Sequence, residues 1–254
     1  MKQFYLLFMT VLLLTGCSLF KSSSDDIPKP QMVTIPGGTF TMGDIYEGEK
    51  NTDAIPTHEV TLPNFRIGKY EVTYRQYDHF AEQTGRRLPS SDSLGRGDRA
   101  VVNVSWINAR AFCEYYGWQL PTEQQWEYAA RSGGQRMQFA GTNNVDSLDL
   151  YARTTNSSAP YSYKVGSRKP NQLGLYDMSG NVFEWIGRYY QFYPENNTKP
   201  EWDNLQERSI RIVRGGSFGY GGEILSTYWR VGMFKEVESG DVGFRCVDPI
   251  TKNK

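Results

Sequence analysis

The amino-acid sequence predicts a loop-rich domain of the α+β class. Phe, Trp and Tyr make up 14% of the chain and Gly contributes 25 of its 254 residues, which favours an aromatic core with many turns. Three short segments show helical periodicity, and short segments that alternate apolar and polar residues lie on both sides of them. A long segment without periodicity follows the third helical segment.

The first strands are expected in two neighbouring pairs. A Pro36-Gly37-Gly38 turn separates the first two, and Pro63-Asn64 separates the next two. Alternation places these strands at Met32–Ile35, Thr39–Met42, Glu59–Leu62 and Phe65–Tyr70. The N-terminal part of the domain is therefore predicted to be β-structure.

Three helices follow, and each has a recognisable start. Thr73 and Gln76 have the spacing of a capping box at the start of the first helix. Ser105 can cap the second helix and Gly117 can end it. Thr122 opens the third helix with a second capping box, and the Ser-Gly-Gly sequence at 132–134 stops it.

Residues 135–180 lack periodicity and are rich in Asn, Ser, Gly and Pro. A loop of this length inside a compact domain is functional, disordered or held by another group. Apolar residues that recur within and just after it argue for order: Leu173, Leu175, Tyr176, Met178, Val182, Phe183 and Trp185. Strands are expected to resume near Ile210–Val213, Tyr228–Val231 and Gly243–Val247.

The N-terminus has the composition of an export signal. Lys2 precedes an apolar run over Phe4–Leu14, and small residues precede Cys17. The run is about half as long as a membrane-spanning helix requires. A buried helix or a short anchor is the alternative interpretation. The sequence Leu14-Thr15-Gly16-Cys17 resembles the lipobox of bacterial lipoproteins, which implies that residues 1–16 are removed and that the Cys17 sulfur carries a diacylglyceryl group.

The segment after Cys17 sets the expected domain boundary. Ser18–Pro30 is rich in Ser, Asp, Lys and Pro, which is typical of a flexible tether. Residues 17–30 would then hold a domain of residues 31–250 off a membrane, to which two or more acyl chains bind stably. Ser18 after the lipid site suits sorting to the outer membrane, so we expect a lipid-anchored protein of a Gram-negative cell envelope.

Charge and cysteine content narrow the class of protein. The chain has 28 basic and 28 acidic residues, and without a basic excess we expect no nucleic-acid partner. Beyond the N-terminal run, no segment is apolar enough to span a membrane. Cys113 and Cys246 could form a disulfide in an oxidising compartment. Two buried free thiols are the alternative, and the sequence leaves both open.

Nine stretches together point to one family. They are Val33–Gly43, Lys69–Thr73, Val102–Trp106, Ala111–Cys113, Leu120–Glu123, Trp126–Arg131, Gly174–Trp185, Arg214–Ser217 and Gly243–Arg245. In this order they resemble the formylglycine-generating enzyme family, also called sulfatase-modifying-factor domains. The resemblance implies a loop-rich variant of the C-type lectin fold. In this family the best-known activity is the oxidation of a sulfatase cysteine to formylglycine.

The resemblance also implies a copper ion held by two cysteines between the Arg-Gly-Gly-Ser turn and the Gly-Phe-Arg strand. Soft thiolates suit Cu(I), whereas hydroxyl and apolar side chains are poor ligands for it. Residues 217–245 contain no cysteine, and the two positions fall near Tyr220 and within the Leu-Ser-Thr sequence at 225–227. We therefore expect no copper, assign no catalytic residue and favour a protein that is not an enzyme.

Other relatives are iron-dependent sulfoxide synthases, which add a helical domain with a histidine cluster. A two-His-one-carboxylate iron site would need both histidines of this chain, His58 and His79. One lies beside an expected strand and the other within an expected helix. We interpret them as unrelated surface or packing residues.

Oxygen ligands for a harder metal ion are present. The resemblance implies that the side chains of Asp177 and Glu184 bind calcium together with the backbone carbonyls of Gly180 and Val182. Carboxylates and carbonyls are the ligands that Ca²⁺ prefers. A structural calcium ion would also explain how the irregular segment stays ordered.

Three functions remain open. The first is a non-catalytic module that binds an envelope protein or a glycan, and gliding-motility and type IX secretion lipoproteins of Bacteroidetes resemble this domain in a similar setting. The second is an oxidoreductase with altered chemistry, to which Tyr220, Ser226 or Thr227 would contribute. The third is a maturation factor that binds a sulfatase without oxidising it.

Two aromatic segments could line a groove for such a partner. They are Trp185–Tyr193 and Phe218–Trp229, and the alternative is that their side chains belong to the core. Arg214 and Arg230 are expected to be structural, through ion pairs or loop anchoring, or to flank such a groove.

Overall fold

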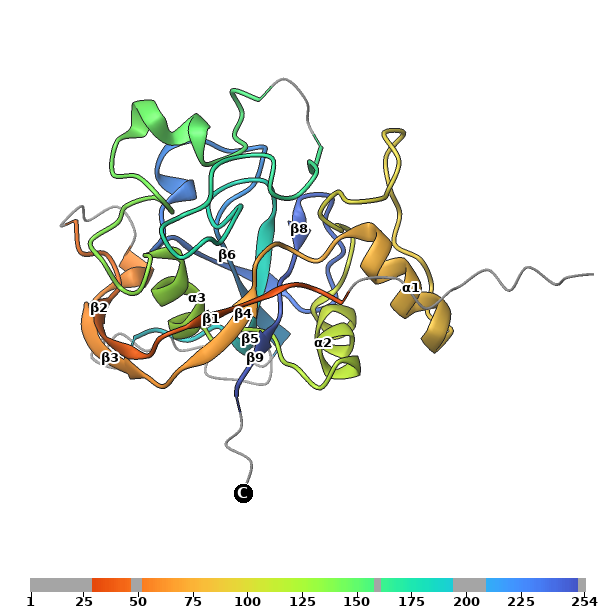
Figure 1. Ribbon diagram of the computed structural model, residues 1–254, viewed down its shortest axis with the longest axis horizontal. Coiled ribbons are helices and arrows are strands. Elements are labelled where there is room, and N and C mark those ends of the chain that lie inside the picture. The colour runs from red at the N-terminus through yellow and green to blue at the C-terminus, as the bar shows by residue number, and fades with distance from the viewer. Residues whose placement is uncertain (1–28, 47–51, 158–160, 194–208, 251–254) are drawn as a thin grey trace, which may run out of the picture.

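A computed structural model of the chain describes residues 29–46, 52–157, 161–193 and 209–250. Within these ranges the strands form three sheets, with the orders β1-β4-β9, β2-β3 and β7-β6-β5-β8 (Figure 1). The strands are β1 Met32–Ile35, β2 Gly38–Met42, β3 His58–Leu62, β4 Phe65–Gly68, β5 Phe183–Tyr189, β6 Ile210–Arg214, β7 Arg230–Phe234, β8 Val242–Gly243 and β9 Val247–Asp248. Short 3₁₀ helices lie at Thr52–Ala54, Val145–Leu150 and Gly222–Leu225.

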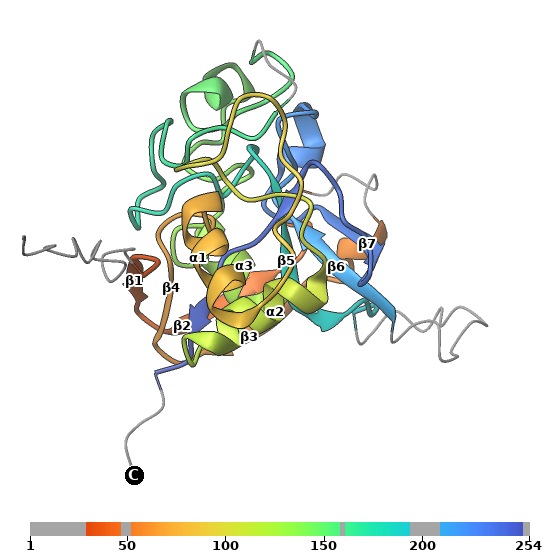
Figure 2. The same ribbon diagram turned by 90° about the vertical axis from the view of Figure 1, so that its right-hand side faces the viewer.

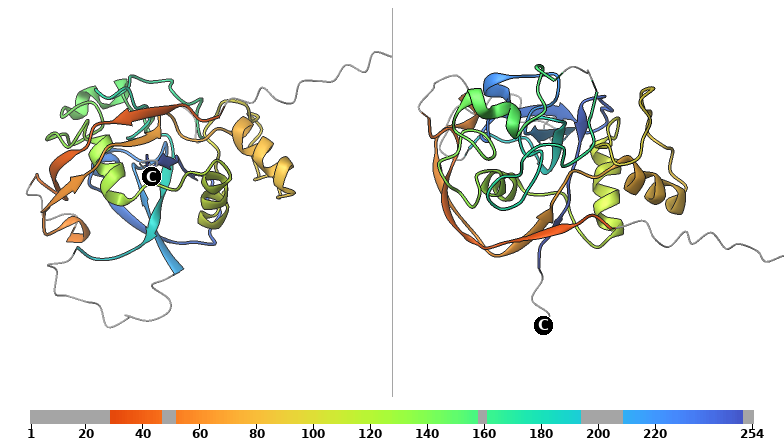
Figure 3. Two further views of the ribbon diagram at one scale, coloured as in Figure 1. Left: turned by 60° about the horizontal axis from the view of Figure 1, so that its bottom comes forward. Right: turned by 45° about the horizontal axis from the view of Figure 1, so that its top comes forward.

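The four N-terminal strands form one long curved ribbon along an edge of the molecule (Figure 3). Both of its pairs are antiparallel, with Ile35 opposite Phe65 in one and Gly38 opposite Leu62 in the other. Gly37 lies between the pairs, where a Cβ atom would stand 2.3 Å from the Leu62 carbonyl oxygen. The expected turn therefore lies where the pairing of the ribbon changes from one sheet to the other. Position 37 needs glycine because the two backbones approach closely there.

The three expected helices are confirmed, together with their starts. They are α1 Tyr74–Thr84, α2 Trp106–Tyr115 and α3 Glu123–Ala130. Thr73 and Thr122 each accept a hydrogen bond in a complete capping box, and Ser105 caps α2. Among the described residues, no helix has the length and apolar character needed to cross a membrane.

Two apolar clusters form most of the core. The first joins α1 and α2 to β5 through stacked and edge-on rings that include Phe80, Phe112 and Phe244. The second surrounds α3, with Trp126 at its centre, and reaches the N-terminal ribbon. Figure 2 shows α2 beside β5, and the loops that follow α3 gather at the end of the molecule opposite the C-terminus (Figures 1 and 2).

The strand predictions need four corrections. The sequence does not predict a strand at Phe183–Tyr189, which is β5, an inner strand of the largest sheet. The first four residues of β5 are all buried, so the alternation that marks a half-exposed strand is absent. The strand expected at Phe65–Tyr70 ends at Gly68, and the strand expected at Tyr228–Val231 begins at Arg230.

The strand expected at Gly243–Val247 is two separate strands. β8 pairs with β5 in a parallel fashion, whereas β9 pairs with β4 in a different sheet. Between them, Phe244, Arg245 and Cys246 are buried and pass from one sheet to the other. The C-terminal segment thereby joins the two sheets.

Candidate functional site

The residues of the recognised motifs meet at the centre of the fold in a buried ion pair. Arg245 donates from Nε to Glu184 Oε2 and from Nη2 to Glu184 Oε1, both at 2.7 Å. The indole N–H of Trp126 donates to Oε2 as well, at 2.8 Å. Both side chains are almost wholly buried, at 0% and 1% exposure. Glu184, expected as a metal ligand, is therefore held by a cation and an indole.

Two further carboxyl groups lie close to this pair. Asp177 is buried, and its Oδ2 accepts a 2.7 Å hydrogen bond from the Gly166 N–H, whereas its Oδ1 has no partner among the described residues. Burial, together with the Glu184 charge, raises the pKa of Asp177 to about 6. Burial raises the pKa of Glu71 well above its usual range, and the Asp177 and Glu184 charges add to this rise.

The donor set fits calcium only in part. The free Oδ1 of Asp177 is a suitable ligand, since a buried carboxylate oxygen without a partner is costly. Gly180 lies at φ +80°, and its N–H donates to Gly215 O, while the Val182 N–H donates to Glu71 Oε1. Glu184 has both oxygens engaged. Within the described ranges, no group of three or more His, Cys, Asp or Glu side chains is arranged to hold a metal ion.

A second buried network lies beneath α3. Arg214 contacts Glu123 at 2.7 Å and Glu127 at 2.5 Å, and Arg230 contacts Glu123 at 2.5 Å. Arg131 contacts Glu127 at 3.0 Å and also donates to carbonyl groups of β2 and the turn after it. The two expected structural arginines, Arg214 and Arg230, thus anchor the C-terminal sheet to α3.

The residues expected at the positions of the missing cysteines have packing contacts or hydrogen bonds in the folded domain. Leu225 is fully buried in a small cluster with Phe139, Leu148 and Ala152. Ser226 and Thr227 are fully buried, and the Thr227 hydroxyl donates to Met137 O at 2.7 Å. Tyr220 is 39% exposed, and its ring packs edge-on against Phe183. The structure therefore gives these residues roles in holding loops together.

The remaining cysteines and the histidines lie apart from this region. Cys113 of α2 forms a disulfide with Cys246, with Cα atoms 5.6 Å apart. His58 stands in β3 with its ring against Tyr193, and its Nδ1 lies 3.1 Å from Pro56 O, whereas His79 stands in α1. Cys17 lies outside the described residues.

Three of the nine aromatic residues in the two segments expected near a groove are core residues. Trp185 is fully buried, and its indole N–H donates to Val104 O at 2.8 Å. Tyr193 and Tyr228 are also buried. Among the described aromatic residues of the two segments, Tyr189 and Tyr220 are the most exposed, at 42% and 39%.

Several residues of the buried networks are not predicted from the sequence. Glu71, Glu123, Glu127 and Arg131 lie within the recognised motifs but received no role. One feature of the sequence does point to them, namely a charged residue between apolar ones, as in Tyr70-Glu71-Val72. Such a residue is buried only when it is paired. Their partners are distant in the sequence, so no local pattern identifies them.

The fold and the buried networks define a loop-rich α+β domain of the C-type-lectin-like, formylglycine-generating-enzyme class. The family described as "sulfatase-modifying factor enzyme 1-like domain" matches residues 18–250, and the chain belongs to this family.

Curated relatives of this chain carry different names. The chain is 30% identical to a serine/threonine-protein kinase pkn1 of Chlamydia pneumoniae, a match that covers 92% of this chain and only 41% of the kinase. It is 27% identical to a formylglycine-generating enzyme of Streptomyces coelicolor, covering 85% of this chain and 88% of the enzyme. It is 28% identical to the chaperone protein LppX of Paenibacillus barcinonensis, covering 84% and 88%.

Solved structures share the fold over most of the chain. Treponema denticola variable protein 1 superposes with a TM-score of 0.72 at 25% identity, covering 86% of this chain and 94% of that protein. PvdO from Pseudomonas aeruginosa superposes with a TM-score of 0.73 at 24% identity, with the same coverage. This second likeness concerns the fold alone.

Proposed function

We propose that this protein is a lipid-anchored module of a bacterial cell envelope that binds an envelope protein or a glycan without oxidising it. The observation that carries the proposal is the position and the bonding of the cysteines. Residues 217–245 contain none, and Cys113 and Cys246 are bonded to each other. The described domain thus offers no thiolate for Cu(I), the ion that suits cysteine ligands.

The surrounding residues support the proposal. Leu225 and Thr227 stand where a thiolate would be needed, and both are fixed in the interior by packing or hydrogen bonds. The family motifs are retained as ion pairs that hold loops, so the scaffold persists without the reactive groups. A fold can carry several functions, and the relatives include both a formylglycine-generating enzyme and a protein named as a chaperone.

The anchor is the first part of the proposal to test. The full chain is expressed in a Gram-negative host with radiolabelled palmitate, alongside the C17A variant. The proposal expects label and membrane recovery for the unaltered chain and loss of both for C17A. A C113A variant serves as the control, because it removes a cysteine of the folded domain and leaves the lipid site intact. Equal labelling of the unaltered chain and C17A would contradict the anchor.

An enzyme with altered chemistry is the second candidate, in which Tyr220, Ser226 or Thr227 contributes to a different site in the same region. The observation in its favour is that two hydroxyl side chains occupy the position of the second cysteine. Metal analysis of the purified protein separates the candidates. Calcium alone supports the binding module, whereas stoichiometric iron or copper supports the enzyme. A sulfatase that co-purifies with the anchored protein would instead support a maturation factor.

We also propose that any calcium ion in this domain is structural and uses Asp177. The supporting observations are the Asp177 Oδ1 atom, which has no partner among the described residues, and the three carboxyl groups that lie close to one buried guanidinium. The ion would supply positive charge at the base of the irregular segment. Glu184 would contribute only by sharing oxygens that Arg245 already binds.

A further inference from the structure

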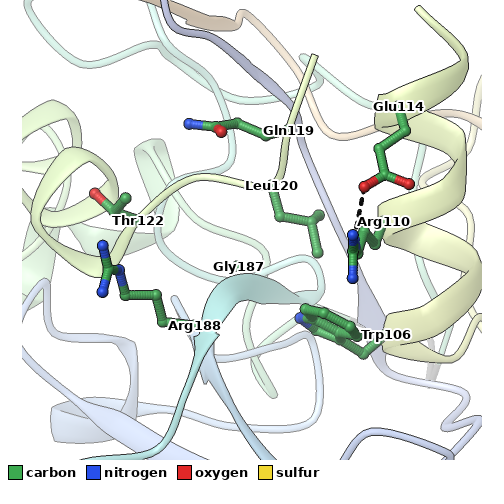
Figure 4. A pocket seen from close by; sticks show the side chains of 8 residues that line it. All are labelled: Trp106, Arg110, Glu114, Gln119, Leu120, Thr122, Gly187 and Arg188. Carbon is green, nitrogen blue, oxygen red and sulfur yellow. Dashed lines mark hydrogen bonds and ion pairs between the residues drawn. The ribbon is translucent and has the colours of Figure 1, made fainter. Parts of the chain in front are cut away.

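A pocket of about 310 Å³ lies between one side of α2, the segment before α3 and the end of β5 (Figure 4). It is separate from the buried networks and from the positions of the missing cysteines. Its lining consists of Trp106, Arg110, Glu114, Gln119, Leu120, Thr122, Gly187 and Arg188. This volume falls at the lower end of the range for ligand pockets, so we expect a small ligand.

The apolar side of the pocket is rigid. The Trp106 indole N–H donates to Ile186 O at 2.7 Å, which fixes the ring against β5. Leu120 is buried at 3% exposure. Gly187 keeps the space open, since its N–H donates to Pro121 O and a Cβ atom would stand 3.0 Å from the Leu120 carbonyl oxygen. The Arg211 guanidinium lies 4.2 Å from the centre of the Trp106 ring, so a ligand would meet only the part of the ring that this side chain leaves uncovered.

On the charged side of the pocket, one cation has no partner among the described residues. Arg110 is paired with Glu114 at 2.7 Å, so these two charges offset each other. Arg188 is exposed, and its side chain forms no ion pair or hydrogen bond with any described residue. Figure 4 shows its guanidinium across the pocket from the Arg110–Glu114 pair, close to Thr122. The lining therefore has a net charge of one positive unit, carried by Arg188.

We propose that this pocket binds a small monocarboxylate, with its apolar body on Trp106 and Leu120 and its carboxylate paired with Arg188. The guanidinium fork matches a carboxylate in a bidentate fashion, which a point charge does not. One unpaired positive charge matches a monoanion.

The test uses two probes that differ only in charge, N-acetylphenylalanine and its uncharged amide. Binding to the purified mature domain is followed by NMR, with the Trp106 indole N–H resonance as the reporter of the pocket. The proposal expects the acid to bind at least about tenfold more tightly than the amide, a difference of about 1.4 kcal/mol in binding free energy. The Trp106 resonance should shift with the acid.

Variants of Arg188 test whether its charge accounts for binding of the acid. R188Q should bring the affinity for the acid down to that for the amide, and R188K should restore part of it, because lysine keeps the charge without the fork. R87Q is the matched control, since Arg87 is an exposed arginine outside the pocket and its loss should change neither affinity. Arg188 is exposed and has no ion pair or hydrogen bond with the described residues, so R188Q should fold like the unaltered protein.

Three results would overturn the proposal. The first is equal binding of the acid and the amide, and the second is unchanged binding of the acid by R188Q. The third is no detectable binding of the acid at about 10 mM, because a formed site should have a dissociation constant below this concentration. A shift of other resonances without the Trp106 indole would place binding elsewhere and would also overturn it.

Discussion

Arg245 and Glu184 face each other with two parallel hydrogen bonds, each 2.7 Å long, at the point where the chain passes from β8 to β9. Arg245 also donates to carbonyl groups of Gly68 and Tyr176. One guanidinium therefore ties together the central strand, the N-terminal ribbon and the irregular segment. Because the pair is buried and both groups are charged, removing either partner is costly.

We expect E184Q to lower the free energy of unfolding by about 3–5 kcal/mol, the usual cost of breaking a buried ion pair. Urea unfolding followed by tryptophan fluorescence measures this. E114Q is the matched control, because Glu114 pairs with Arg110 at the surface, where such a pair contributes about 1 kcal/mol or less. Equal stability of the two variants would show that the Arg245–Glu184 pair does not hold the fold.

Asp177 should make the domain less stable as the pH rises. Its pKa in the folded protein, about 6, lies above its ordinary value of 3.8, so the folded state binds the proton more tightly. The resulting stability is present below pH 3.8 and is lost as the pH rises through about 6. Relative to D177N, the unaltered protein should lose about 2 kcal/mol between about pH 4 and pH 8 in the presence of a chelator.

The asparagine variant is a suitable comparison because Asp177 lies at φ +58°, a conformation that asparagine also adopts. Its side-chain oxygen can still accept the Gly166 N–H. Urea unfolding at several pH values gives the two profiles. Parallel profiles would mean that Asp177 keeps an ordinary pKa in the folded protein.

Calcium should reverse this loss if it binds at Asp177. At neutral pH, calcium in about 100-fold excess over its dissociation constant should stabilise the unaltered domain by about 2.7 kcal/mol. D177N should respond far less, since it lacks the charged ligand. Thermal unfolding with calcium or with a chelator makes the measurement, with magnesium as the control ion. An equal response of both proteins would place calcium elsewhere.

The disulfide should contribute substantially to stability. It joins α2 to the C-terminal segment across a sequence separation of 133 residues, and closing such a loop restricts the unfolded chain. Reduction should lower the free energy of unfolding by about 2–5 kcal/mol. The C113A/C246A double variant should have lower stability that no longer responds to the reductant. A reductant effect of the same size on both proteins would refute this role.

Features set by neighbouring residues could be predicted from the sequence. Thr73, Ser105 and Thr122 cap helices through hydrogen bonds to residues three positions away, so the three helix starts were evident. β5 was missed because its first four residues are buried on both faces and show no alternation. The division between β8 and β9 depends on Arg245, whose side chain reaches Glu184 61 positions earlier.

The candidate site was harder to predict for the same reason. Asp177 and Glu184 have the composition and spacing of calcium ligands, but the sequence alone does not reveal that Arg245 occupies both oxygens of Glu184. The pocket beside Trp106 was also not evident, because Arg188 reaches it only through the course of β5. By contrast, the absence of cysteine from residues 217–245 is visible in the sequence itself.

The central claim is that the domain binds without oxidising. The most direct measurement incubates the purified protein with copper, oxygen and a cysteine-containing sulfatase peptide, and detects formylglycine by mass spectrometry. The formylglycine-generating enzyme of Streptomyces coelicolor serves as the positive control. We expect unmodified peptide with this protein and conversion with the control. Copper-dependent conversion by this protein would contradict the claim.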